Sequence, residues 1–88
     1  MKFEWDANKN ESNIRKHGIA FEDASKIFFR KRLEKRSDRA GEIRYITVGE
    51  VNNRIIVVIY TPKGENIRII SARKARKNEK RAYRSIQS

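Results

Sequence analysis

The 88-residue chain has no cysteine and only one histidine, and these two shortages exclude several classes of protein. Without cysteine there is neither a disulfide framework nor a thiolate-bound metal centre. One imidazole cannot build a histidine-rich metal site, and the carboxylates show no ligand-like clustering in the sequence. We therefore expect a functional site that uses no metal and no other cofactor.

Long apolar runs are also missing. The longest, residues 55–60, is far too short to cross a bilayer, and the N-terminus begins with Phe3-Glu4-Trp5-Asp6 rather than the apolar core of a signal peptide. We therefore expect a soluble, cytoplasmic protein that makes no membrane contact. Because so short a chain can build one core only, we also expect one domain over residues 1–88.

Acidic residues are scarce, with 11 Asp or Glu against 22 Lys or Arg and a net charge of +11. Eight cations and one Glu fall between residues 68 and 84. Such a surface attracts polyanions, and nucleic acid is the first partner to consider. A ribosomal protein, a membrane-surface binder or a chain kept soluble by charge could have the same composition, so charge alone leaves these alternatives open.

The hydrophobic pattern predicts an α+β fold in the order β-α-α-β-β-β-α. The expected strands span residues 2–5, 44–51, 54–61 and 66–72, and the expected helices span residues 6–17, 21–29 and 73–86. Asp6 is a suitable N-cap and Gly18 a suitable stop for the first helix. Residues 30–41 read as a loop, with at most a short edge strand around residues 33–36.

Two turns join the last three strands into an antiparallel meander. Asn52 and Asn53 fit a two-residue hairpin turn, because asparagine tolerates positive φ. Residues 61–65, which contain Pro62 and Gly64, form the second turn. Residues 55–60 are apolar at every position, so their strand should be central and covered on both faces. We expect a four-stranded antiparallel sheet packed with helices, and no helix between residues 44 and 72.

Several motifs in order along the chain resemble one family of small toxins. They are Phe3-Glu4-Trp5-Asp6, residues 13–18 followed by residues 21–24, residues 41–45, and residues 68–73 followed by Glu79 and Tyr83. This pattern is similar to that of the BrnT toxins, which are RelE-like ribonucleases of bacterial type II toxin–antitoxin pairs. Ala20 replaces the usual Ser or Thr cap, and Arg30-Lys31 replaces the usual Asp-Pro, so the departures concern loop geometry.

The resemblance implies metal-independent RNA cleavage, with the RNA's own 2′-hydroxyl attacking the adjacent phosphorus. This chemistry needs a base, an acid and cations that stabilise the phosphorane. Arg68 and Arg73 are the first candidates for the cations, because guanidinium offers two parallel donors to phosphate. Arg68 should point away from the face of Ile67 and Ile69, and Arg73 should lie where the strand becomes a helix. For each, the alternative is a solvated surface arginine.

Three further residues are candidates for acid–base or positioning roles. Glu79 stands among cations on the final helix, where it could move a proton or hold an arginine in place by an ion pair. His17 titrates nearest to neutral pH but ends the first helix, where it could simply cap carbonyl groups. Tyr60 closes the central strand, where it could act on the substrate or be a core residue with a satisfied hydroxyl.

The expected RNA-binding surface consists of cations and one aromatic residue that follow the same segments. Tyr83 could stack on a base or, as is more usual for such a tyrosine, belong to the core. The predicted RNA-binding residues are Lys16, Arg44, Lys74, Arg76, Lys77, Lys80 and Tyr83.

Two classes of function remain open from the sequence. The first is a toxin ribonuclease that arrests translation and growth. By resemblance, it would be neutralised by an antitoxin with a dimeric ribbon-helix-helix DNA-binding domain. A complex with two copies of each chain would then bind operator DNA through the antitoxin. The second is a non-catalytic nucleic-acid-binding or ribosome-associated module, since phosphate binding needs only the basic helix. Glu79 favours the enzyme, because a pure binding surface gains nothing from a carboxylate.

Overall fold

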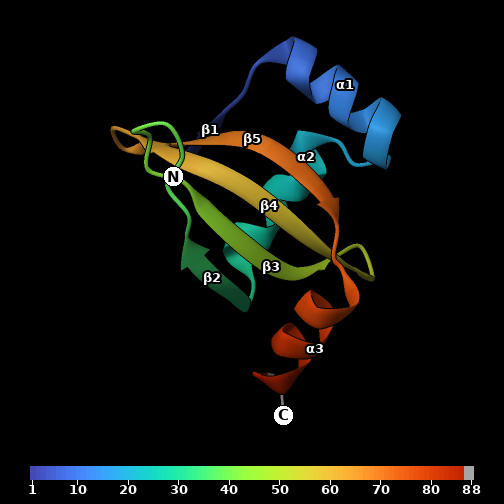
Figure 1. Ribbon diagram of the computed structural model, residues 1–88. Coiled ribbons are helices and arrows are strands. Elements are labelled where there is room, and N and C mark those ends of the chain that lie inside the picture. The colour runs from blue at the N-terminus through green and yellow to red at the C-terminus, as the bar shows by residue number, and fades with distance from the viewer. Residues whose placement is uncertain (87–88) are drawn as a thin grey trace.

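The computed structural model describes residues 1–86, which form a mixed five-stranded sheet with helices around it (Figure 1). The elements in chain order are β1 (Lys2–Glu4), α1 (Ala7–His17), α2 (Phe21–Ala24), the 3-10 helix η1 (Ser25–Phe29), β2 (Arg32–Arg36), β3 (Tyr45–Val51), β4 (Arg54–Lys63), β5 (Asn66–Lys74) and α3 (Lys77–Ser85). The α+β class is confirmed, and residues 44–72 contain no helix.

The prediction of a four-stranded antiparallel sheet was wrong in two respects. The strand order is β1-β5-β4-β3-β2, with β2 as a fifth strand, and β1 runs parallel to β5. The element order is therefore β-α-α-β-β-β-β-α. Most side chains of β2 are charged, so its periodicity is weak, although Leu33 lies opposite Val48. For β1, the direction of pairing depends on the path of α1, α2 and β2, which no local pattern reveals.

The boundaries of two predicted helices also need correction. The final helix begins at Lys77 instead of Arg73, because Arg73 and Lys74 continue the β5 ladder opposite Val57 and Ile56. The second helix is α-helical only to Ala24 and continues as 3-10 helix to Phe29.

The predicted caps and turns were mostly confirmed. The Asp6 side chain accepts hydrogen bonds from the N–H groups of Asn8 and Lys9, and Gly18 ends α1 with a φ of +69°. β4 is the central strand, and Asn52 and Asn53 both have positive φ in the hairpin turn. The second turn is shorter than expected, because β4 continues through Pro62 to Lys63 and only residues 64 and 65 form the turn.

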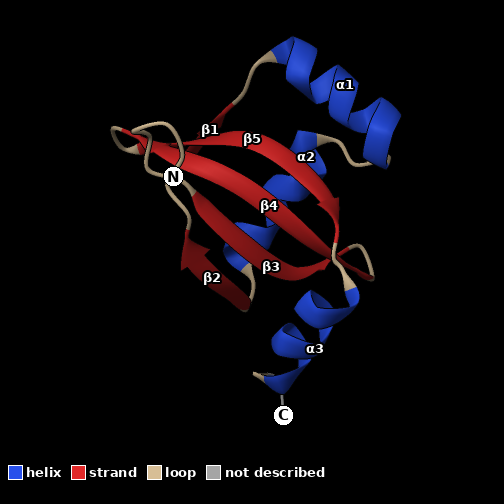
Figure 2. Cartoon of the chain, in the orientation of Figure 1, coloured by secondary structure: helices blue, strands red, loops and turns tan. Residues whose placement is uncertain are grey.

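Helices pack against both faces of the sheet (Figure 2). α2 and η1 cover the face that we call the helical face, where the larger core cluster lies. Its fully buried members include Phe21, Ile27, Val58 and Ala72. On the opposite face, which we call the groove face, α3 packs against one end of the sheet only. There a second cluster contains Val48, Val57, Ala75 and Tyr83.

A β-bulge in β5 changes which side chains share a face. Ile69 and Ala72 both pack on the helical face, although a regular strand would send residues three apart to opposite faces. The register shift at the Ile59/Tyr60 step leaves Ile70 as the extra residue. From Ser71 onward, the alternation of β5 is therefore reversed.

Asn13 joins α1 to the outer edge of β5. Its side-chain nitrogen donates to the carbonyl oxygens of Ile19 and Ala72 at 2.8 Å each, and its side-chain oxygen accepts from the Ala72 N–H at 3.1 Å. Asn13 is only 7% exposed. The amide thus satisfies β5 backbone groups beyond the end of the short strand β1.

We expect Asn13→Ala to lower the free energy of unfolding by about 2–4 kcal/mol, because it leaves three buried backbone groups without partners. Chemical denaturation would measure the change. Asn8→Ala, at an exposed position of the same helix, is the matched control and should cost about 0.5 kcal/mol or less. Equal stabilities of the two variants would contradict a structural role for the Asn13 amide.

Candidate functional site

The groove face contains an open groove between α3 and the strands β2 and β3, with a volume of about 540 Å³. Apolar side chains form much of its lining, and charged residues of β2, β5 and α3 lie along it. The lining residues are Leu33, Glu34, Lys35, Ile46, Val48, Arg73, Arg76, Asn78, Glu79 and Ala82. Of the predicted site residues, the groove brings together Arg73, Arg76 and Glu79.

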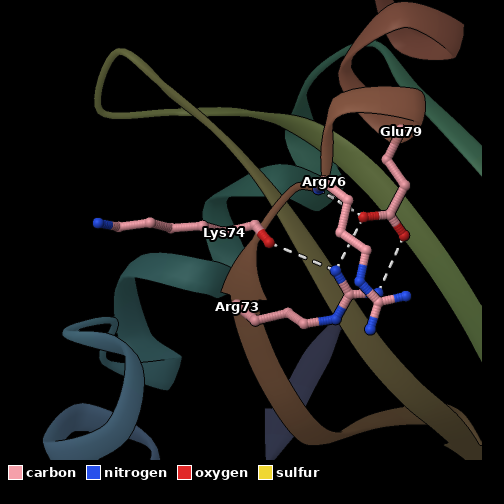
Figure 3. Close-up of polar contacts among 4 residues, drawn as sticks. All are labelled: Arg73, Lys74, Arg76 and Glu79. Carbon is pink, nitrogen blue, oxygen red and sulfur yellow. Dashed lines mark hydrogen bonds and ion pairs between the residues drawn. The ribbon is translucent and has the colours of Figure 1, made fainter.

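Arg73 and Glu79 form a two-pronged ion pair in this groove (Figure 3). Arg73 Nη1 donates to Glu79 Oε1 at 2.8 Å, and Arg73 Nη2 donates to Glu79 Oε2 at 2.9 Å. The two side chains are only 21% and 18% exposed. Two parallel hydrogen bonds in a half-buried pair hold the guanidinium in one orientation. A flexible surface arginine has no such fixed orientation.

The local sequence explains how Glu79 reaches this position. Arg76 is the N-cap of α3, and Glu79 is the third residue of the helix, as in a capping box. Glu79 Oε1 accepts a hydrogen bond from the Arg76 N–H at 2.7 Å. One carboxylate therefore caps α3 and orients Arg73.

The same contacts fix the charge of the pair. The hydrogen bonds from Arg73, helped by the Arg76 N–H and by nearby cations, lower the pKa of Glu79 to about 2 against the opposing effect of burial. The Glu79 carboxylate in turn raises the pKa of Arg73. Glu79 is thus ionised at neutral pH and has both oxygens engaged, so the geometry favours positioning of Arg73 over proton transfer.

Arg68 lies on the groove face near the opposite end of β5. It pairs in register with Thr61, whereas Arg73 pairs with Val57 four residues away on β4. The bulge therefore places both arginines on one face, about 15 Å apart along the strand. Arg68 Nη1 donates to Glu4 Oε2 at 3.1 Å. The structure does not bring Arg68 into the groove.

Tyr60 belongs to the helical face. The residue is 7% exposed, and its ring stacks on Tyr45 with a centroid distance of 5.3 Å and meets Phe28 edge-on. Its hydroxyl donates to Glu34 Oε1 at 2.6 Å, and Arg32 pairs with the same oxygen. Burial and this hydrogen bond raise the pKa of Tyr60 to about 12. The geometry supports a core residue that fastens β2 to the sheet.

His17 and Lys16 lie at the end of α1, away from the groove. They line a shallow hollow with Ser71 and Ile70 of β5, and both side chains are exposed. His17 is in the last turn of α1, where an imidazole can interact with the final carbonyl groups. The structural alternative for His17 therefore fits its position.

The remaining predicted RNA-binding residues fall in three environments. Arg44 forms an ion pair with Glu42 at 2.7 Å near the start of β3. Tyr83 is 2% exposed and its hydroxyl donates to the Lys31 carbonyl oxygen, so a base could stack on its ring only if the ring left the core. The other three cations, Lys74, Lys77 and Lys80, lie outside the groove. They line two hollows near Ile55 and along the outer side of α3.

Sequence reasoning missed the groove walls contributed by β2 and β3. Leu33, Lys35, Ile46 and Val48 line the groove because β2 pairs with β3. The signal available in the sequence was the possible edge strand at residues 33–36, which was not connected to the site.

Residues 1–86 contain no group of three or more His, Cys, Asp or Glu side chains placed to hold a metal ion. No helix in the same range has the length and apolar character needed to span a membrane.

Comparison with known protein families identifies the family of this chain. No curated protein matches the chain. Residues 5–79 match the family model described as the ribonuclease toxin, BrnT, of type II toxin–antitoxin systems. The match covers most of the chain, from Trp5 within the first motif to Glu79 in the groove. The chain therefore belongs to the BrnT family of ribonuclease toxins of type II toxin–antitoxin systems.

Proposed function

We propose that this BrnT-family toxin is a metal-independent endoribonuclease whose groove acts on a phosphate of RNA, and that its cleavage of RNA arrests translation and growth. The observation that carries the proposal is the Arg73–Glu79 pair, which fixes a guanidinium at an open groove on a strongly basic protein. An oriented cation of this kind stabilises the charge that develops on phosphorus during the reaction.

In this mechanism, the 2′-oxygen of one nucleotide forms a bond to the adjacent phosphorus, and the bond from phosphorus to the 5′-oxygen breaks. Solvent water takes the proton of the 2′-hydroxyl and supplies a proton to the departing 5′-oxygen. The products carry a 2′,3′-cyclic phosphate and a 5′-hydroxyl. Arg73 contacts the non-bridging oxygens, and Arg76 adds a second cation at the groove. The residues that line the groove include no imidazole, so charge stabilisation and positioning provide most of the rate enhancement.

Arg68 binds another phosphate of the same strand in this proposal. Its separation of about 15 Å from Arg73 prevents both from contacting one phosphate while each keeps its own carboxylate partner. RNA would then run along the groove face parallel to β5. His17, Tyr60 and Tyr83 are assigned no contact with the reacting atoms.

A type II toxin implies a cognate antitoxin that neutralises it. We propose that this antitoxin carries a ribbon-helix-helix DNA-binding domain and forms a complex with two copies of each chain. Operator DNA would then be bound through the antitoxin. The net charge of +11 favours an acidic segment in such a partner.

The alternative is a non-catalytic module that only binds nucleic acid or the ribosome. The cations on the outer side of α3 would serve it equally well. Glu79 distinguishes the ribonuclease from the binding module less clearly than the sequence suggested. Its carboxylate caps α3, and this structural role is useful to either function. The reaction itself must therefore separate the two functions.

We expect the purified protein to cleave RNA in the presence of excess EDTA and to leave 2′,3′-cyclic phosphate ends, because the 2′-oxygen remains bonded to phosphorus. Mass spectrometry of the fragments would identify these ends. The matched control is the same RNA with a 2′-deoxy nucleotide at the cleaved position, which should stay intact. Loss of cleavage in EDTA, or fragments ending in a simple 3′-hydroxyl, would contradict the mechanism.

A further inference from the structure

A second cationic surface lies on the side of α3 that faces away from the groove. It consists of two adjoining hollows of about 430 Å³ and 310 Å³, which share Lys80 and Arg84. β4, β5 and α3 all contribute to it. We call it the α3 outer surface, and its cations are Arg54, Lys74, Lys77, Lys80, Arg81 and Arg84.

These six cations have no carboxylate partner among the described residues. Within residues 1–86, none of the six takes part in an ion pair, whereas Arg44, Arg68 and Arg73 each have one. Glu50 is the one carboxylate that lines the two hollows. One carboxylate against six cations leaves most of their positive charge unbalanced, and clustered cations produce a strong local positive potential.

The α3 outer surface and the groove lie on opposite sides of one helix. Arg76, Glu79 and Ala82 of α3 line the groove, while Lys77, Lys80 and Arg84 line the outer hollows. The neighbouring residues of β5 divide in the same way. Figure 3 shows the Lys74 side chain extending away from the Arg73–Glu79 pair. An RNA strand that passes over the start of α3 can thus contact both the groove and the α3 outer surface.

The lining of the hollows indicates which kind of polyanion fits. Ile55 is their only apolar residue, and the rest of the lining is charged or amidic. A protein partner usually needs buried apolar or aromatic anchors for affinity, and this surface offers almost none. A phosphate backbone needs only spaced cations and water.

We propose that the α3 outer surface is an RNA exosite, which binds phosphates of the strand outside the cleaved position and delivers that strand to the groove. This inference rests on the proposed function, because it gives the ribonuclease site its substrate path. It adds Arg54, Arg81 and Arg84 as phosphate contacts. It also assigns Lys74, Lys77 and Lys80 to affinity and not to the chemical step.

The test compares two double variants at exposed positions. Arg54→Gln with Arg84→Gln removes two cations of the exosite, and Arg15→Gln with Lys63→Gln removes two exposed cations from α1 and from the end of β4. Both double variants reduce the net charge equally. Circular dichroism would verify that each is folded. The binding probe is a short single-stranded RNA with every 2′-hydroxyl methylated, so it cannot be cleaved by the proposed route.

We expect the exosite variant to bind this RNA about tenfold more weakly than the control variant at about 50 mM salt. The difference in Kd between the two variants should become smaller near about 200 mM salt. The slope of log Kd against log salt should fall by about 1.4 for two lost phosphate contacts on a single strand. With cleavable RNA, the exosite variant should have a higher KM than the control variant and an unchanged kcat. A second pair, Lys74→Gln with Lys80→Gln, should behave in the same way.

Equal slopes and equal KM for the exosite and control variants would overturn the proposal. It would also be overturned if the exosite variant bound RNA normally but lost affinity for the antitoxin, since the surface would then be a protein interface. If the wild-type protein cleaved no RNA while the exosite variant still lost RNA binding and salt dependence, the exosite would stand and the proposed reaction would fall.

Discussion

Arg73→Ala is expected to lower the rate of RNA cleavage by about 30- to 1,000-fold and to abolish growth arrest. The guanidinium is the one cation of the groove held by two parallel hydrogen bonds, so its contact with the transition state should be worth about 2–4 kcal/mol. Single-turnover cleavage with saturating enzyme would measure the rate directly. Arg73→Lys should recover only part of it, because an ammonium keeps the charge but loses the fork.

The matched control for this variant is Arg36→Ala. Arg36 also forms a two-pronged pair, with Asp38 at 2.9 Å for both hydrogen bonds, but it lies outside the groove. It should keep full activity. Arg73→Ala leaves the half-buried Glu79 without its partner, so antitoxin binding and the unfolding transition must show that the variant is folded. Full toxicity of folded Arg73→Ala would remove Arg73 from the site.

Arg68→Ala shows whether the site extends along β5. Because Arg68 is assigned to a neighbouring phosphate, its loss should also reduce toxicity, chiefly through weaker RNA binding. A fall in kcat as large as that of Arg73→Ala would instead mean that both arginines act at the reacting phosphate.

Glu79→Gln is expected to slow cleavage by about 100-fold while leaving the affinity for methylated RNA unchanged or slightly higher. Glutamine keeps the size of the side chain but cannot accept both Arg73 hydrogen bonds as a carboxylate does, so the guanidinium would lose its fixed position. Since the pKa of Glu79 is about 2, the wild-type pH–rate profile between pH 5 and 8 should show no ionisation of this group. A step in that range that vanished in Glu79→Gln would instead identify a proton-transfer role.

The double variant Arg73→Ala with Glu79→Gln separates positioning from direct action. If Glu79 acts only through Arg73, the double variant should be no slower than Arg73→Ala alone. An additional loss would give Glu79 an independent part in the reaction. Full cleavage by Glu79→Gln would reduce the pair to a structural contact that caps α3.

The sequence predicted those parts of the fold that depend on local chemistry. Asp6 and Gly18 delimited α1, paired asparagines marked the hairpin turn, and continuous apolar residues identified β4 as central. Each of these signals acts within a few residues. The strand β2 was weakly visible, since most of its side chains are charged and its pairing with β3 is decided by tertiary contact.

The sequence could identify individual residues of the site, but it could not predict how they are arranged in space. Arg73 and Glu79 could be chosen from their motif and their charge, but their fork depends on β5 continuing to Lys74 and on α3 beginning only at Lys77. The separation of Arg68 from Arg73 and their common face both depend on the bulge at Ile70. Alternation of residue types does not reveal an inserted residue, because isoleucine suits either face of a strand.

The Asn13 amide has a consequence for how other chains can approach this sheet. Free edges of a sheet are where foreign strands add and where aggregation begins. Here β1 covers the first part of β5 and the Asn13 amide occupies Ala72 beyond it, while four of the five residues of β2 at the opposite edge are charged. These contacts and charges therefore disfavour intermolecular strand addition at both edges of the sheet. We therefore expect a partner to recognise side chains of this protein and not to extend its sheet with an added strand.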